Sequence, residues 1–221
     1  MMRVDTNPDK GSCAQVFDDL IIALDPPENR RGKCEGKGRH LTEAAVMLAY
    51  GMHLLRTVPG LRTITLNPDG EHAKRFEIAR WLSARDFVRK EAPGKAAFVG
   101  TYVCGEQSIV VASISGKGDV VAATRDKTII AECKGGIVNT RHAGQTSRLR
   151  KGLCEAVGLL MGRAKGGRQV AVVPHTETTL RLARKLAPRA RDAGIEIALV
   201  DELGRVTDIV PDTSPTVQTM Q

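Results

Sequence analysis

Aromatic side chains are scarce in this chain. Phe, Tyr and Trp together make up 3% of its 221 residues, whereas the hydrophobic residues as a whole make up 42%. The core must therefore consist mainly of Leu, Val, Ile and Ala, and Trp81, at helical spacing from other apolar residues, is predicted to belong to it. So few rings do not favour the recognition of single-stranded nucleic acid by stacking of bases on aromatic side chains.

The five cysteines form no recognisable framework. Their number is odd, no C-x-x-C spacing occurs, and no secretory signal begins the chain. We therefore expect reduced thiols in a cytoplasmic protein. Cys133 is expected to face the core, since the neighbouring sequence offers no base that would activate it as a nucleophile. The apolar runs are far too short for a transmembrane helix, so no membrane partner is expected.

An excess of basic residues indicates the class of partner. Lys and Arg number 33 against 25 for Asp and Glu, which gives a net charge of +8. This balance favours polyanionic partners without setting a sequence preference, although a merely soluble basic protein would carry the same charge. The length suits one domain with extensions. We expect a flexible basic N-terminal extension (1–40), a folded domain (41–210) and a disordered tail (211–221).

The spacing of apolar residues predicts alternating helices and strands. Thr42 is a plausible N-cap for the first helix, and Pro188 is expected to kink or interrupt the last one. The predicted helices are 42–56, 71–88, 144–161 and 178–193, and the predicted strands are 62–66, 96–104, 108–115, 119–123, 128–133, 169–173 and 195–200. This order predicts an α/β fold with a mixed central sheet flanked by helices.

Charged residues stand at the end of a predicted hairpin. Asp119 begins one short apolar run, Glu132 and Lys134 end the next, and the charged turn Arg125–Lys127 joins the two runs. Alternate side chains of a strand share a face, so Glu132 and Lys134 point the same way. Two carboxylates and an ammonium form a site for a hard divalent cation and a phosphate, whose two carboxylates we expect within about 4–6 Å of each other. A structural salt bridge at a strand end is the alternative.

The runs Gly118–Ala122 and Ile130–Lys134 resemble the core of the PD-(D/E)xK nuclease superfamily. The resemblance covers roughly 71–200, and it implies a restriction endonuclease-like fold and hydrolysis of phosphodiester bonds in DNA, with RNA left open. It also implies that Asp119 and Glu132 bind Mg²⁺ or Mn²⁺, while Lys134 orients the attacking water or offsets charge on the phosphorane. Gly118 stands where the family has proline, a common variation that leaves the metal ligands in place.

A third metal ligand is expected on the helix that precedes these strands. In the resembling nucleases a glutamate on the first core helix often completes the metal site, and Glu77 fits that pattern. Glu71 is the rival, because a carboxylate at the start of the same helix also interacts favourably with the helix dipole. Solvated acids on a helix face would explain both residues.

The segment after Lys134 is basic and leads into a predicted helix. Gln145 matches the glutamine that several members of the superfamily carry near the active site, so the resemblance gives it a catalytic role. Four cations in this segment suit backbone phosphates, as do free N–H groups at a helix start: Arg141, Arg148, Arg150 and Lys151. A solvated basic helix end would explain the arginines equally well. Of the nearby histidines, His142 is a weaker candidate for phosphate contact, and His175 is interpreted as structural.

Three functions are therefore carried forward. The first is a Mg²⁺-dependent deoxyribonuclease, and the second is a non-catalytic nucleic-acid-binding protein on the same fold. The third is an interaction protein whose basic segments bind an acidic partner. Salt-dependent binding to both DNA and heparin, without metal-dependent cleavage, would favour the last two. Assembly as a homodimer is left open.

Overall fold

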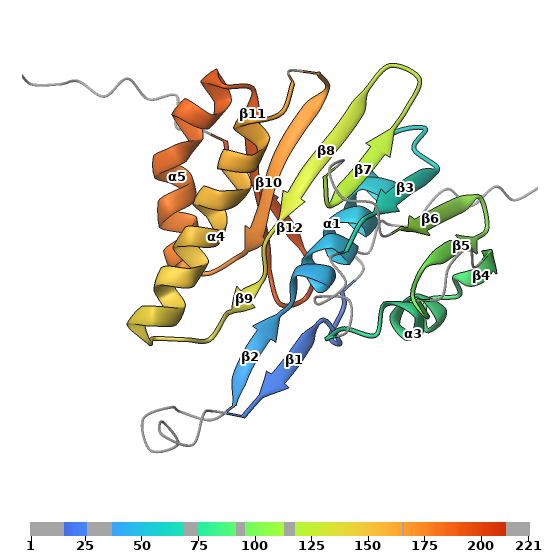
Figure 1. Cartoon of the computed structure of the whole chain (residues 1–221), viewed down its shortest axis with the longest axis horizontal. Helices are drawn as coiled ribbons and strands as arrows, with labels where there is room; N and C mark the ends of the chain where they lie inside the picture. The colour runs from blue at the N-terminus through green and yellow to red at the C-terminus, as the bar shows by residue number, and fades with distance from the viewer. Residues whose placement is uncertain are drawn as a thin grey trace, which may run out of the picture.

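A computed structural model describes residues 16–25, 37–68, 75–91, 96–112, 118–164 and 166–210. Within them, a nine-stranded mixed sheet has the order β12-β11-β10-β8-β7-β3-β6-β5-β4 (Figure 1). Its strands are β3 (Thr63–Leu66), β4 (Val88–Glu91), β5 (Gly100–Cys104), β6 (Gln107–Val111), β7 (Val120–Ala123), β8 (Thr128–Cys133), β10 (Arg168–Pro174), β11 (Ile195–Val200) and β12 (Val206–Asp208). A smaller sheet joins β1 (Ile21–Leu24), β2 (Gly38–Leu41) and β9 (Gly136–Ile137).

The strand directions divide the large sheet into two parts. Strands β3, β7 and β8 form an antiparallel series, in which β7 and β8 are the predicted hairpin. Strands β8, β10 and β11 are parallel, because helices α4 (Ala143–Met161) and α5 (Glu177–Asp192) cross back between them. The carboxyl ends of β8, β10 and β11 therefore lie next to one another at the same end of the strands, where β8 leads into β9.

Helix α1 (Glu43–Thr57) covers one face of the sheet. The side chain of Thr42 accepts a hydrogen bond from the Ala45 N–H and caps the helix as predicted. The helix is apolar nearly all round and is almost entirely buried. It approaches β3 closely, since a Cβ added at Gly51 would lie 2.5 Å from Ile64 Cδ1. The first turn of α1 lies near the carboxyl end of β8 (Figure 1).

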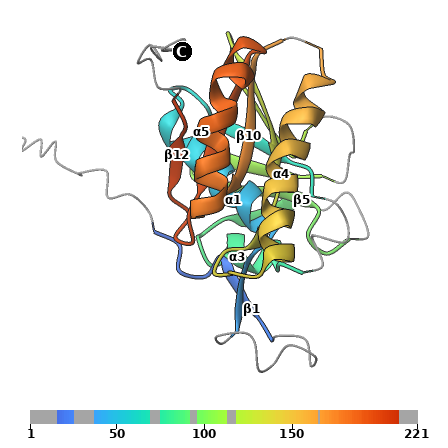
Figure 2. The same cartoon turned by 90° about the vertical axis from the view of Figure 1, so that its left-hand side faces the viewer.

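Helices α4 and α5 cover the opposite face over β8, β10 and β11. Figure 2 shows the two helices side by side on this flank of the molecule. Their inward residues Leu153, Leu160 and Ala183 pack with Ala171 and Ile197 of the parallel strands. The expectation of a mixed sheet with flanking helices is confirmed. None of the helices in the described residues combines the length and the apolar character needed to cross a bilayer.

Several local predictions were wrong. In the described part of the predicted helix 71–88, only α3 (Ile78–Ser83) is helical, because Asp86 takes a left-handed backbone conformation with φ of 62° and β4 begins at Val88. A kink or an interruption was expected at Pro188 of the last helix. The helix is not interrupted there, and the proline lies on its exposed face.

Part of the segment 1–40, for which a flexible basic extension was expected, contributes to the fold. Phe17 is buried in the main core, and its N–H donates to the Leu203 carbonyl at 2.9 Å. Residues 21–24 and 38–41 pair as an antiparallel hairpin. Residues 1–15, 26–36 and the predicted tail 211–221 lie outside the described residues.

Candidate functional site

The structure brings Asp119 and Glu132 to the same end of the β7–β8 hairpin. The Asp119 N–H donates to the Ala131 carbonyl at 2.9 Å, and Asp119 Oδ2 accepts from the Cys133 N–H at 2.7 Å. The carboxylate of Asp119 thus accepts a hydrogen bond from the backbone of β8 at the residue that follows Glu132. This convergence is the arrangement that the sequence pattern predicts.

The sharp bend of the backbone directly before Asp119, here called the corner, requires glycine at position 118 for two reasons. Its φ of +101° is one that residues with a Cβ rarely adopt, and a Cβ there would lie 2.6 Å from Ile130 Cγ2. A proline, whose ring holds φ near −65°, could not take this conformation. Asn67 fixes the corner, because its N–H donates to the Asp119 carbonyl and its side chain donates to the Gly118 carbonyl, both at 2.8 Å.

Glu132 is almost fully buried, at 4% exposure, and is paired with an arginine. Arg163, just beyond the end of α4, donates from Nε to Glu132 Oε1 at 3.0 Å and also from Nη2 to the same oxygen. A buried carboxylate needs such a partner, because an uncompensated charge in the interior is strongly destabilising. Nothing in the local sequence pattern pointed to Arg163.

Lys134 lies between two carboxylates. Its Nζ is 3.4 Å from Glu43 Oε2 and 3.2 Å from Glu155 Oε1. Helix α4 passes close to it, because a Cβ added at Gly152 would lie 3.2 Å from the Cβ of Lys134. Burial disfavours the ammonium, but Glu43 and Glu155 outweigh that effect and raise the pKa of Lys134. The side chain is therefore held charged on the α4 side of β8.

Glu43 is a further site residue that the sequence reasoning missed. It occupies the first turn of α1 and is buried, at 8% exposure. Gly135 brings it close to β8, because a Cβ on Gly135 would lie 2.5 Å from the Glu43 backbone nitrogen. An acid directly after the N-cap of the most apolar helix was the available signal, but a favourable interaction with the helix dipole also explains an acid there.

The carboxyl group of Asp119 has a strongly raised pKa. Burial raises the pKa of Asp119 to about 7, and the nearby charges of Glu132 and Glu43 also raise it, against the Cys133 N–H and Lys134, which lower it. Together with Glu155 and Arg163, the cluster holds four carboxylates and two cations. Fully ionised, it carries a formal charge of −2.

These charges are arranged as ion pairs. Glu132 is turned to Arg163, while Glu43 and Glu155 are turned to Lys134. Among the described residues, no group of three or more His, Cys, Asp or Glu side chains is placed to hold a metal ion.

Glu77 is not part of this cluster. It lies directly before α3, beside β4 and far across the sheet from β8 (Figure 1), and its exposed carboxylate is 3.1 Å from Arg80 Nη1. Its rival Glu71 lies outside the described residues. Trp81, by contrast, is core as predicted, with its Nε1 donating to Asp19 Oδ1 at 3.0 Å.

The residues predicted to contact nucleic acid lie on or just before α4. Gln145 is in its first turn and partly exposed, and its side chain makes no hydrogen bond with the described residues. His142 is the N-cap, since its Nδ1 accepts from the Gly144 N–H at 3.2 Å. The four predicted cations are exposed and form no ion pair with described residues: Arg141, Arg148, Arg150 and Lys151.

The cysteines in the described residues are free thiols, as expected. Cys104, Cys133 and Cys154 are free, while Cys13 and Cys34 lie outside the described residues. Cys133 faces the core, and burial raises the pKa of its thiol. A thiolate nucleophile at this position is therefore disfavoured.

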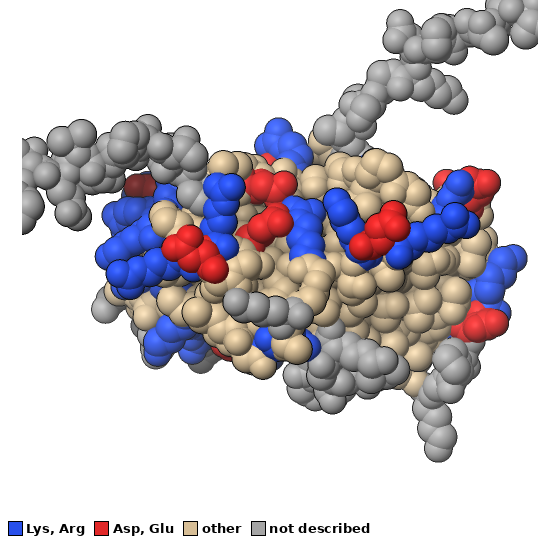
Figure 3. Space-filling model, turned by 90° about the horizontal axis from the view of Figure 1, so that it is seen from above, with Lys and Arg blue, Asp and Glu red and all other residues tan. Residues whose placement is uncertain are grey.

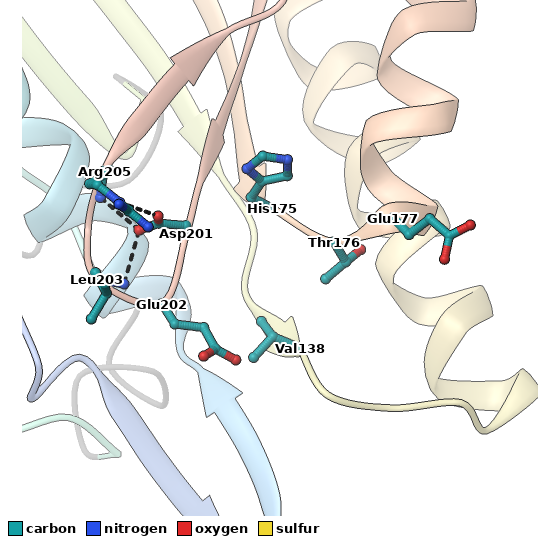
Figure 4. Close-up of a pocket in the computed structure, with 8 residues that line it drawn as sticks. All are labelled: Val138, His175, Thr176, Glu177, Asp201, Glu202, Leu203 and Arg205. Atoms are coloured by element: carbon teal, nitrogen blue, oxygen red, sulfur yellow. Dashed lines mark hydrogen bonds and ion pairs between the residues drawn. The ribbon is translucent and has the colours of Figure 1, made fainter.

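A separate open cavity of about 390 Å³ lies at the carboxyl ends of β10 and β11 (Figure 4). Asp201 on its wall is already satisfied, because it accepts from the N–H groups of Leu203 and Arg205 and pairs with the Arg205 guanidinium. The other lining residues are Val138, His175, Thr176, Glu177 and Glu202. None of the cluster around Glu132 lines it.

The end of β8 therefore combines buried carboxylates, a charged lysine and a net negative charge. Carboxylate oxygens are the ligands that hard divalent cations prefer, but Glu132 and Glu43 here face Arg163 and Lys134. Comparison of the chain with protein-family models, with curated proteins and with solved structures gave no match.

Proposed function

We propose that the protein is a metal-dependent nuclease that hydrolyses phosphodiester bonds in DNA. The observation that carries the proposal is the convergence of Asp119, Glu132, Lys134 and Glu43 at the end of the β7–β8 hairpin. Perturbed ionisable groups that gather around a specific charge partner are a recognised mark of functional sites.

The order of elements supports this proposal. Helix α1, strands β3, β7 and β8, helix α4 and strand β10 follow each other as α-β-β-β-α-β, with β4–β6 between β3 and β7. This order is compatible with the restriction endonuclease-like fold that the sequence resemblance implies. In that arrangement α1 is the first core helix, so Glu43 takes the place that was assigned to Glu77.

The donor set fits Mg²⁺ or Mn²⁺. Carboxylate oxygens are the protein ligands that such hard cations prefer, and Asp119, Glu132 and Glu43 supply them. A divalent cation would also neutralise the formal charge of −2 on the cluster. Its binding requires Glu132 to turn away from Arg163 and Glu43 to loosen its contact with Lys134.

Each residue has a role in this chemistry. The bound cation would polarise the scissile phosphate and lower the pKa of a water molecule. Lys134, freed from Glu43, would orient that water or offset negative charge that develops on the phosphoryl oxygens. Gln145 and Arg148, on the helix that borders Lys134, are proposed to position the substrate phosphates, with Arg141, Arg150 and Lys151 as further backbone contacts.

A non-catalytic nucleic-acid-binding protein is the second candidate. The observation that favours it is that Glu132 and Lys134 are both ion-paired within the protein, with no need for a metal ion. Such pairs could serve only to stabilise the end of the hairpin.

A cleavage assay separates the two candidates. Linear, circular and branched DNA should be cut by the protein only with Mg²⁺ or Mn²⁺, and Asp119→Ala, Glu132→Ala, Lys134→Ala and Glu43→Gln should each lower the single-turnover rate by on the order of 100-fold or more. Lys134→Ala should keep its affinity for the cation, because lysine is not a metal ligand. Glu77→Gln is the matched control and should cut as the parent does. Equal cleavage by all five variants would place the chemistry elsewhere, and DNA binding without any cleavage would favour the second candidate.

A further inference from the structure

The outer face of α5 carries five exposed cations. None of them forms an ion pair with a described residue. The acidic residues of the helix, Glu177 and Asp192, stand at its two ends. The five cations are Arg181, Arg184, Lys185, Arg189 and Arg191.

Several arginines elsewhere in the chain are neutralised by a partner. Arg62 pairs with Glu106, Arg80 with Glu77 and Arg205 with Asp201, although all three arginines are largely exposed. On α5 the same type of side chain is left without a counter-ion among the described residues. Figure 3 shows Lys and Arg side chains gathered at the left-hand end of the molecule, where Figure 1 places α5.

The geometry of the helix turns these charges into an ordered row. Arg181, Lys185 and Arg189 are four residues apart, so they follow one stripe of the helix at steps of about 6 Å. Arg184 and Arg191 lie together on one side of the stripe. On the inner side, Ala183, Ala187 and Ala190 are buried against the sheet, which holds the row on a rigid support.

The chemistry of this face matches a line of phosphates. Duplex DNA carries one negative charge per about 1.7 Å of its axis, so a row of cations at this spacing faces several phosphates. An anionic membrane surface is the other extended polyanion, but interfacial helices insert large apolar side chains. The apolar side of α5 is packed on the sheet, and the large hydrophobic residues exposed in the described part of the chain all lie outside α5.

We infer that the outer face of α5 is a docking surface for the phosphate backbone of duplex nucleic acid. The surface is distinct from the candidate site. Helix α5 packs on β11 and α4, whereas Lys134 pairs with Glu155 of α4 and Glu132 pairs with Arg163 beyond the end of α4. Docking on α5 needs neither a bound metal ion nor cleavage of the DNA. A duplex on α5 would lie on the same helical layer as α4, which carries the exposed Arg150 and Lys151.

Salt-dependent binding of a short DNA duplex, measured in EDTA, tests this surface. The triple variant Arg181→Ala, Lys185→Ala and Arg189→Ala should bind at least about tenfold more weakly at low salt. Its log–log salt slope should fall by roughly 2.7, because each lost phosphate contact contributes about 0.9. Alanine favours helix, so the fold is retained, and thermal unfolding checks this.

A second triple variant is the matched control. Arg62→Ala, Arg80→Ala and Lys127→Ala remove the same charge from exposed positions elsewhere and should leave affinity and slope nearly unchanged. Equal losses in the two triples would mean that net charge alone drives binding, and would overturn the inference. So would a parent that binds phosphatidylserine vesicles but not DNA. Binding is measured in EDTA and cleavage with Mg²⁺ or Mn²⁺, so the two proposals are tested separately. A protein that binds DNA through α5 in EDTA but does not cut DNA with Mg²⁺ or Mn²⁺ would refute the proposed nuclease activity and leave the docking surface standing.

Discussion

An Asp119→Asn variant should be more stable than the parent above pH 7, and the two should be equally stable near pH 3. Burial raises the pKa of Asp119 from 3.8 to about 7, so ionisation of this side chain in the folded state costs roughly 4 kcal/mol at neutral and higher pH. Asparagine carries no charge but keeps an oxygen that can accept from the Cys133 N–H. The free energy of unfolding, measured by urea titration in EDTA across pH 3–9, gives the comparison.

The sign of the effect follows from proton binding. Between the two pKa values the unfolded chain has lost the Asp119 proton while the folded chain retains it, so the parent loses stability as pH rises from about 4 to 7. Asp126→Asn, on the exposed turn between β7 and β8, should change little at any pH. A constant difference between Asp119→Asn and the parent would contradict the account. Mg²⁺ should narrow the difference, because the cation stabilises the ionised carboxylate of the parent.

An Arg163→Met variant should lose about 3 kcal/mol of stability in EDTA. The substitution leaves the carboxylate of Glu132 buried without the guanidinium that now pairs with it. The double variant Arg163→Met with Glu132→Gln should recover much of the loss, because no charge then remains buried. A double-mutant cycle on the free energies of unfolding should give a coupling of about 2 kcal/mol.

The exposed Glu77–Arg80 pair provides the control for this cycle. Arg80→Met should cost less than about 1 kcal/mol, as is usual for solvent-exposed ion pairs. If Arg163→Met costs no more than Arg80→Met, the Glu132–Arg163 pair does not hold the site together. If a cation binds Glu132, Mg²⁺ should restore part of the stability of Arg163→Met and little of that of the double variant.

The hairpin and its three charged residues could be predicted from the sequence because they depend on local patterns. Two apolar runs joined by a charged turn predict the hairpin, and the alternation of a strand places Glu132 and Lys134 on one face. The mixed sheet could likewise be predicted from the order of elements.

The partners of these charges could not be predicted in this way. Arg163 meets Glu132 only because α4 folds back over β8, and Glu43 meets Lys134 only because Gly135 lets the start of α1 approach. Such contacts join residues 31 or more positions apart and leave no periodic signal. Glu77 was chosen because the resembling nucleases carry a glutamate on the first core helix, and its segment was predicted to be that helix. In the structure only the short α3 follows Glu77, and Asp86 beyond it is left-handed.

The most direct test of the proposed function is the position of a bound cation. In crystals soaked with Mn²⁺, anomalous scattering should show a peak coordinated by Asp119 and Glu132, with Glu43 close by and the guanidinium of Arg163 withdrawn from Glu132. Crystals of Glu132→Gln soaked in the same way should lack the peak. A parent crystal that shows no peak at the end of β8 and keeps the Glu132–Arg163 pair intact would contradict the proposal that this cluster is a metal-dependent nuclease site.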